Sequence, residues 1–108
     1  MSYDVSIGED YFNYTSNLGR FFYDHIADEG KGGGLRELHG VTGKQGAEIL
    51  SRAFQQISAG RNRIDEASYK AEYDAKNGWG TTFGALVFLA DIMASCVQNP
   101  RKRITLSM

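Results

Sequence analysis

Four side chains of the types that bind metal ions lie at short spacings in the first half of the chain: Asp24, His25, Asp28 and His39. Carboxylate oxygens and imidazole nitrogens are common ligands of zinc in proteins. The two histidines follow none of the established ligand spacings. A small metal-dependent enzyme using Asp24, His25 and His39 is therefore the third hypothesis for function, and we expect neither a bound metal nor another cofactor.

Two glycine-containing stretches invite comparison with phosphate-binding loops. Thr42-Gly-Lys-Gln45 contains a Gly-Lys pair, but the phosphate-loop motif requires glycine where Leu38 stands and serine or threonine where Gln45 stands. Residues 28–34 contain four glycines within five positions, framed by neither a strand nor a helix N-terminus. We reject the first stretch as a phosphate site and interpret the second as a flexible glycine-rich loop.

Catalysis by a nucleophile or a tuned carboxyl group finds little support. Cys96 lies in the most apolar stretch of the chain, where a thiol packs as a small hydrophobe and its pKa is raised. Asp91 could be a buried proton-transfer group, but its position on a polar stripe favours a solvated or hydrogen-bonded edge residue. We therefore predict no catalytic residue and no enzyme activity.

A cluster of aromatic and amide side chains is the leading candidate for binding. Tyrosine and tryptophan offer flat surfaces with a polar tip, and asparagine offers a donor and an acceptor, which suits recognition of a partner surface or a planar ligand. The alternative is that the rings rim the core while the asparagines cap local backbone. The predicted binding residues are Tyr11, Asn13, Tyr14, Asn17, Tyr23 and Trp79.

A basic segment offers a second binding hypothesis. Arg101, Lys102 and Arg103, with Arg61 and Arg63 as allies, could hold the phosphates of a nucleic acid. Three cations after a helix are also explained by the helix dipole. The formal net charge is −1, so no overall field attracts nucleic acid or an acidic membrane. Nucleic-acid binding is therefore the alternative to the aromatic cluster.

The element expected to organise these residues is a central helix over residues 82–98. Thr81 or Thr82 can cap its first turn, and Pro100 stops it. The apolar run is about 15 residues long, against the roughly 20 that a bilayer requires, so we predict no membrane span. Asp91 and Phe88 lie on a narrow stripe expected to be its only wet edge. We predict that neighbouring elements cover one wide surface of this helix and much of its flank. The surface is formed by Phe83, Leu86, Val87, Ala90, Met93, Ala94 and Val97, and the flank by Leu89, Ile92 and Cys96.

Three further helices are predicted around the central one. The first begins near Thr15, and Gly19 within it indicates close approach to another helix. The second begins at Thr42, which can form a capping box with Gln45. The third, over residues 60–76, has only a thin face of small residues.

Both ends of the chain alternate apolar and polar residues, at 3–7 and 104–108, which predicts two short extended segments. They could pair with each other or with the same element of a second copy. The predicted fold class is therefore mainly α. It is a compact bundle of three to four helices around residues 82–98, in a single helical domain over residues 1–108.

Composition and cysteine content indicate the class of protein. The chain is 42% hydrophobic, which is enough for a core, and it has a single cysteine, which fits a reducing compartment. Its first residues lack the basic start and apolar stretch of a secretion signal, so we expect a cytoplasmic protein. An exposed Phe88 and two unpaired terminal strands would favour a homo-oligomer.

Four segments resemble parts of small, uncharacterised proteins encoded by bacteriophages and prophages: Tyr3-Asp-Val-Ser-Ile-Gly, Tyr11-Phe-Asn-Tyr-Thr-Ser-Asn, Lys76-Asn-Gly-Trp-Gly and Gln98-Asn-Pro-Arg-Lys. The resemblance covers most of the chain in sections. It implies a cytoplasmic accessory protein made during infection, and it identifies no catalytic residue. We therefore expect a non-catalytic phage accessory protein that binds a host protein, or sequesters a small ligand, through the Tyr/Asn/Trp cluster.

Overall fold

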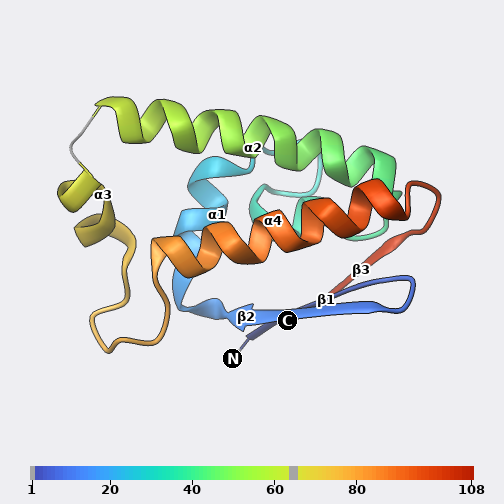
Figure 1. The fold of residues 1–108 in the computed structure, drawn as a ribbon, viewed down its shortest axis with the longest axis horizontal. Coiled ribbons are helices and arrows are strands. Elements are labelled where there is room, and N and C mark those ends of the chain that lie inside the picture. The colour runs from blue at the N-terminus through green and yellow to red at the C-terminus, as the bar shows by residue number, and fades with distance from the viewer. Residues whose placement is uncertain (1, 64–65) are drawn as a thin grey trace.

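The computed structural model describes residues 2–63 and 66–108, without the side chains of residues 61–63 and 66. It shows helices lying over one small sheet (Figure 1). Short 3-10 helices at Ser16–Leu18 and Gly34–Leu38 precede α1 and α2 respectively. In chain order the main elements are β1 (Ser2–Ile7), β2 (Asp10–Thr15), α1 (Gly19–His25), α2 (Gly43–Arg63), α3 (Glu66–Tyr73), α4 (Thr82–Gln98) and β3 (Ile104–Ser107).

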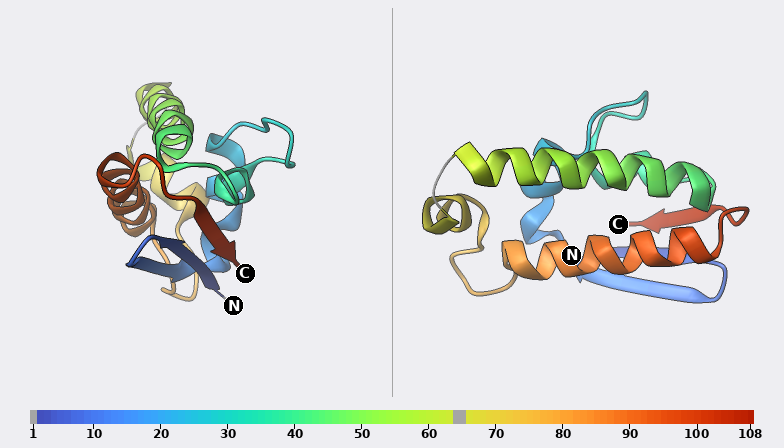
Figure 2. Two further views of the ribbon diagram at one scale, coloured as in Figure 1. Left: turned by 90° about the vertical axis from the view of Figure 1, so that its right-hand side faces the viewer. Right: turned by 45° about the horizontal axis from the view of Figure 1, so that its top comes forward.

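The two long helices, α2 and α4, run side by side in opposite directions along the long axis of the molecule (Figures 1 and 2). The sheet lies below α4, and β2 follows this helix along its length in the opposite direction. Helix α1 fills the space between α2 and the sheet. This arrangement places β2, which is an edge strand, directly beside α4.

The sheet has the strand order β2-β1-β3, and both pairings are antiparallel. Gly8 and Glu9 form the two-residue turn between β1 and β2, and the positive φ of Gly8 (59°) is the arrangement of a type II′ turn. On the other side of β1, β3 pairs with Ile104 opposite Ile7. Of the two pairings left open for the terminal segments, the structure shows the pairing with each other.

The prediction of a mainly α, all-helical bundle is wrong, because β2 joins the terminal strands in a three-stranded sheet and the fold is mixed α/β. Tyr11 and Tyr14 place large rings on opposite faces of β2, so the alternation of apolar and polar residues that predicts a strand is absent there. The available signal was Gly8-Glu9 between two runs of β-prone residues, a spacing typical of hairpins.

The outer edge of β3 is covered by residues 39–42, the segment that leads into α2. The backbone N–H of Gly40 donates to the Ile104 carbonyl oxygen at 2.7 Å. Two residues further along β3, the N–H of Leu106 donates to Nδ1 of His39 at 3.0 Å. The N–H and carbonyl groups of Ile104 and the N–H of Leu106 are therefore paired on this edge of the sheet.

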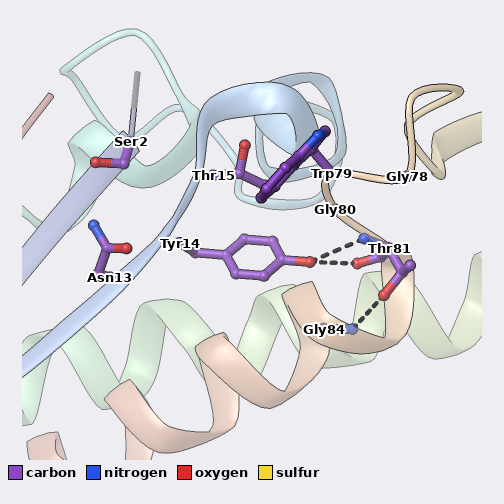
Figure 3. A pocket seen from close by; sticks show the side chains of 9 residues that line it. All are labelled: Ser2, Asn13, Tyr14, Thr15, Gly78, Trp79, Gly80, Thr81 and Gly84. Carbon is purple, nitrogen blue, oxygen red and sulfur yellow. Dashed lines mark hydrogen bonds between the residues drawn. The ribbon is translucent and has the colours of Figure 1, made fainter.

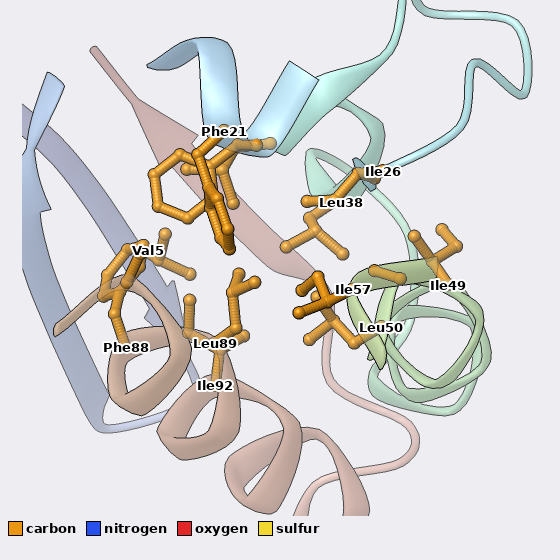
Figure 4. Close-up of a cluster of buried hydrophobic side chains, with 14 of the residues drawn as sticks. Val5, Phe21, Ile26, Leu38, Ile49, Leu50, Ile57, Phe88, Leu89 and Ile92 are labelled. Carbon is orange, nitrogen blue, oxygen red and sulfur yellow. The ribbon is translucent and has the colours of Figure 1, made fainter. Parts of the chain in front are cut away.

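The hydrophobic core lies between the sheet and the helices (Figure 4). Val5 and Ile7 enter it from β1, and Phe21 and Phe22 enter it from α1, with at most 1% of each side chain exposed. Burial of an aliphatic or aromatic side chain of this kind stabilises the fold by about 1.5–3 kcal/mol. These contacts hold the sheet against the helices and so fix the position of β2.

The predicted starts of α4 and α2 are confirmed. Thr81 caps α4 by accepting the N–H of Gly84 at 3.0 Å. At the start of α2, Thr42 and Gln45 form the reciprocal hydrogen bonds of a capping box. The helix predicted over residues 60–76 is divided between the end of α2 and α3, and residues 64 and 65 lie outside the described residues.

The main buried face of α4 differs from the predicted one, although the predicted burial of the flank at Leu89, Ile92 and Cys96 is confirmed. Leu89 and Ile92 are fully buried, as is most of their face, whereas Phe83 and Val97 are 70% and 65% exposed. Phe88, expected on the wet edge, is 5% exposed. In a helix that is apolar around most of its circumference, the spacing of apolar residues does not identify the buried face. Tertiary packing therefore determines which face is buried.

The glycine-rich loop is bound by carboxylates. The side chain of Glu37, which is 2% exposed, accepts the backbone N–H groups of Glu29, Lys31 and Gly33 at 2.8 to 3.0 Å. Asp28 accepts two further N–H groups from the loop, and these hydrogen bonds hold the pKa of its carboxyl below the usual value. The flexibility of this loop stays a prediction.

Candidate functional site

Tyr14 connects β2 to the start of α4. Its hydroxyl donates to the carbonyl oxygen of Thr81 at 2.9 Å and accepts the N–H of Thr81 at 3.0 Å (Figure 3). The ring stacks on Phe88, with centroids 5.4 Å apart and planes at 24°. A Cβ atom at position 84 would overlap the Tyr14 hydroxyl, so glycine is required there. Gly84 therefore lies close to a residue of a strand. Gly19, which was predicted to approach another helix, likewise lies close to a strand residue, Tyr3 of β1.

The turn before α4 presents Trp79 to solvent. Asn77 Oδ1 accepts the N–H of Trp79 at 3.0 Å, and Asn17 Nδ2 donates to the Trp79 carbonyl at 2.9 Å. Gly80 has a positive φ of 121° and lies against Leu18, where a side chain would clash. The backbone of the turn is therefore held from both sides, while the indole ring is 72% exposed.

Two adjoining hollows, of about 580 and 490 Å³, lie between β2 and α4. They share Asn13, Tyr14 and Gly84, and we name the combined feature the β2–α4 groove. Its other principal lining residues are Tyr11, Trp79, Phe83, Val87, Phe88 and Asp91.

The groove brings together most of the predicted aromatic and amide cluster. Tyr11, Asn13, Tyr14 and Trp79 line it, and Asn17 supports it through the hydrogen bond to the Trp79 turn. The sixth residue, Tyr23, lies on α1 near Gly33, away from the groove.

Part of the cluster also serves the local structure, as the alternative hypothesis proposed. The side chain of Asn13 donates to Asp4 at 2.8 Å, and the Tyr11 hydroxyl donates to the same carboxylate oxygen. The bond to Tyr11 is the larger cause of the lowered pKa of Asp4, and it raises the pKa of Tyr11. These side chains therefore pack and bond on the outer face of the sheet, while the rings of Tyr11 and Trp79 remain exposed.

Sequence reasoning missed three residues on the α4 side of the groove. Phe83 and Val87 are 70% and 44% exposed, and Asp91 is exposed beside them. Because the helix was expected to bury Phe83 and Val87, no pattern assigned them to a site. Asp91 was correctly predicted as an edge residue, but its position beside β2 depends on the tertiary fold.

The metal-ligating candidates are engaged in other contacts. His25 is buried, with Nδ1 2.7 Å from the Phe21 carbonyl oxygen and Nε2 3.1 Å from the Tyr69 hydroxyl. His39 accepts the N–H of Leu106 through Nδ1. Within the described residues, no group of three or more His, Cys, Asp or Glu side chains is placed to hold a metal ion.

Cys96 is fully buried in α4 beside Gly46, and burial raises the pKa of its thiol to about 11. The thiol is therefore protonated near neutral pH and is not activated as a nucleophile.

Three of the basic candidates, Arg101, Lys102 and Arg103, lie at the opposite end of α4 from Trp79. Arg101 and Lys102 are exposed, and Arg103 donates to the Gly40 carbonyl oxygen at 2.6 Å, which supports the covered edge of β3. The side chains of Arg61 and Arg63 lie outside the described part of the chain.

Comparison with protein-family models, with curated proteins and with solved structures gives no match. Among the described residues, no helix has both the length and the apolar character needed to cross a membrane.

Proposed function

We propose that this chain is a non-catalytic accessory protein of the phage type, and that it binds a segment of a host protein in the β2–α4 groove. The observation that carries the proposal is the exposure of three large rings among the residues that line the two adjoining hollows. Trp79, Phe83 and Tyr11 are 72%, 70% and 61% exposed. Exposed aromatic side chains gathered at a concave surface are typical of protein-recognition sites.

The exposed rings of Trp79 and Phe83 take no part in the hydrogen bonds that hold the groove together. Tyr14 joins β2 to the start of α4 through its hydrogen bonds to Thr81, and Asn17 and Asn77 hold the backbone of the Trp79 turn. The indole of Trp79 and the ring of Phe83 are therefore available for a partner. The backbone that carries these rings is already held by hydrogen bonds, which lowers the entropic cost of binding.

The proposal is tested by selecting binders from a displayed library of random twelve-residue peptides on the immobilised protein. We expect enriched peptides that bind the wild type and lose roughly tenfold or more in affinity for Trp79→Ala and for Phe83→Ala. Tyr23→Ala is the matched control, because Tyr23 is 65% exposed but lies away from the groove, and it should bind as the wild type does.

Two results would contradict the proposal. One is the absence of any enriched peptide. The other is equal binding by the wild type and by both groove variants. Oligonucleotide binding that falls steeply with salt and disappears in an Arg101→Ala, Lys102→Ala double variant would favour the nucleic-acid hypothesis instead. A small molecule retained in native mass spectrometry, and lost in Trp79→Ala, would favour ligand sequestration.

A further inference from the structure

The free edge of β2 carries backbone groups without partners. In a hairpin with a two-residue turn, the residues flanking the turn, here Ile7 and Asp10, form a hydrogen-bonded pair, and such pairs alternate along the strands. Phe12 and Tyr14 therefore bond to β1, and the backbone groups of Tyr11 and Asn13 point away from it. Among the described residues, none bonds to these backbone groups.

The same alternation is confirmed on the opposite edge. It directs the backbone of Ile104 and Leu106 away from β1, and both residues make their hydrogen bonds to residues 39–42 there. The two edges thus follow one rule, but only the edge of β3 is covered.

Helix α4 provides a wall above the free edge. Phe83, Val87 and Asp91 follow one another at intervals of four residues, which is a rise of about 6 Å per interval. Alternate residues of an extended chain are about 6.6 Å apart, so successive inward side chains of an added strand would meet these three residues in turn. The Asp91 carboxylate has no hydrogen-bond or ion-pair partner within the described chain.

We propose that the β2–α4 groove takes an extended segment of a partner polypeptide as a fourth strand along β2. The segment bonds through its backbone to Tyr11 and Asn13. It places two apolar side chains against Phe83 and Val87 and a basic side chain beside Asp91. This proposal rests on the proposed function and specifies the partner as a short apolar-x-apolar-x-basic sequence, in either direction along the strand.

A second copy of this chain does not fit the same edge. Antiparallel pairing of β2 with itself about a two-fold axis keeps both α4 helices on one face of the joined sheet, each following its own β2. Adjacent strands are about 4.8 Å apart, whereas packed helices require about 8–10 Å. The two helices would collide, so the occupant is a segment without such a helix above it.

The sharpest test alters the backbone of the partner. The probe is a synthetic version of the strongest peptide selected from the random library, N-methylated at every second residue in two complementary sets. We expect one set to weaken binding roughly tenfold or more and the other to leave it within about threefold, because only alternate N–H groups of an added strand face β2. Equal effects of both sets would overturn strand addition.

A pair of protein variants tests the same geometry from the other side. Asn13→Pro removes the N–H that faces the free edge, where proline is tolerated because β1 does not use that group. Asn13→Ala keeps the N–H and removes the side chain. We expect Asn13→Pro to bind the selected peptide with roughly tenfold or more lower affinity than Asn13→Ala does. Thermal unfolding should confirm that both variants are folded.

The charge at Asp91 supplies a further readout. When the peptide library is selected on the immobilised Asp91→Lys variant, the enriched peptides should carry an acidic residue where selection on the wild type enriches a basic one. The side chain of the partner must complement the new charge. Unchanged peptides would overturn this part of the proposal.

The failures of the two proposals are distinguishable. If no peptide is selected, the proposed function and strand addition both fail. If peptides are selected but the N-methyl sets act alike and Asn13→Pro binds as Asn13→Ala does, the groove binds without strand addition. If sedimentation shows a dimer that Asn13→Pro dissociates, the occupant is a second copy and the proposal is wrong.

Discussion

The two edges of the sheet differ in whether another segment of the chain covers them. Residues 39–42 cover β3 and pair with the backbone of Ile104 and Leu106, whereas β2 lies uncovered below α4 with the backbone of Tyr11 and Asn13 unpaired among the described residues. Exposed edges are usually blocked by charges, proline, bulges or covering segments. The covered edge is part of the hydrogen bonding of the fold itself, and the open edge is the one for which we propose a partner strand.

The largest effect is expected at the covered edge, with Gly43→Ala. A Cβ atom there would overlap the backbone carbonyl oxygen of Asn99, and the N–H of Gly43 donates to Lys102 at 2.8 Å. The overlap forces the start of α2 away from the turn before β3. We expect the free energy of unfolding to fall by roughly 3 kcal/mol, measured by urea denaturation.

Gly60→Ala is the matched control in the same helix. A Cβ atom at position 60 meets only ordinary contacts, and alanine is the better helix former, so the variant should be as stable as the wild type or up to about 1 kcal/mol more stable. Equal losses in the two variants would mean that close packing at Gly43 does not hold the covered edge.

Native-state hydrogen exchange compares the two edges directly. The amide of Leu106 donates to His39, so it should exchange at least about tenfold more slowly than the amides of Tyr11 and Asn13. On addition of a selected peptide, the amides of Tyr11 and Asn13 should slow while that of Leu106 stays unchanged. Protection of Tyr11 and Asn13 in the free monomer would remove the distinction between the edges.

Tyr14→Phe tests the connection between the open edge and α4. The substitution leaves the ring stacked on Phe88 but removes both hydrogen bonds to Thr81. We expect a loss of about 1 kcal/mol in the free energy of unfolding, together with weaker peptide binding, because the wall of the groove is no longer fixed to β2. Tyr23→Phe, at a hydroxyl without such bonds, should change neither measurement.

The smallest effect concerns Asp4 on the outer face of the sheet. Its folded-state pKa is lowered from 3.8 by the hydrogen bond from Tyr11, followed by that from Asn13. Its stabilising contribution is therefore present above pH 3.8 and is lost as the pH falls through the lower folded-state pKa. NMR titration should show a higher Asp4 pKa in Tyr11→Phe than in the wild type. Identical titration curves would show that the Tyr11 bond does not form in solution.

Local chemistry made several elements predictable. The limits of α4 follow from Thr81 at its start and Pro100 after its end, and the start of α2 follows from the capping pair of Thr42 and Gln45. The alternation at the two ends of the chain likewise predicted β1 and β3. For the helix limits the determining groups lie within a few residues, and for the strands the alternating pattern itself is the signal, so the sequence alone contains both.

The residues that line the groove were predictable in part by type, but not by arrangement. Tyr11, Asn13, Tyr14 and Trp79 were assigned from their chemistry, yet Tyr23 was wrongly grouped with them because proximity in sequence does not imply proximity in space. Hydrogen bonding of Tyr14 to Thr81, 67 residues away, is what assembles the groove.

By itself the sequence determined where α4 begins and ends, where α2 begins and which ends of the chain are extended. Only the tertiary structure decided that β2 is a strand, that α4 exposes Phe83 and Val87, and that one edge of the sheet stays open. The reason is physical. A strand with large rings on both faces and a helix apolar on nearly all sides have no internal pattern that selects an inside, so long-range packing makes the choice.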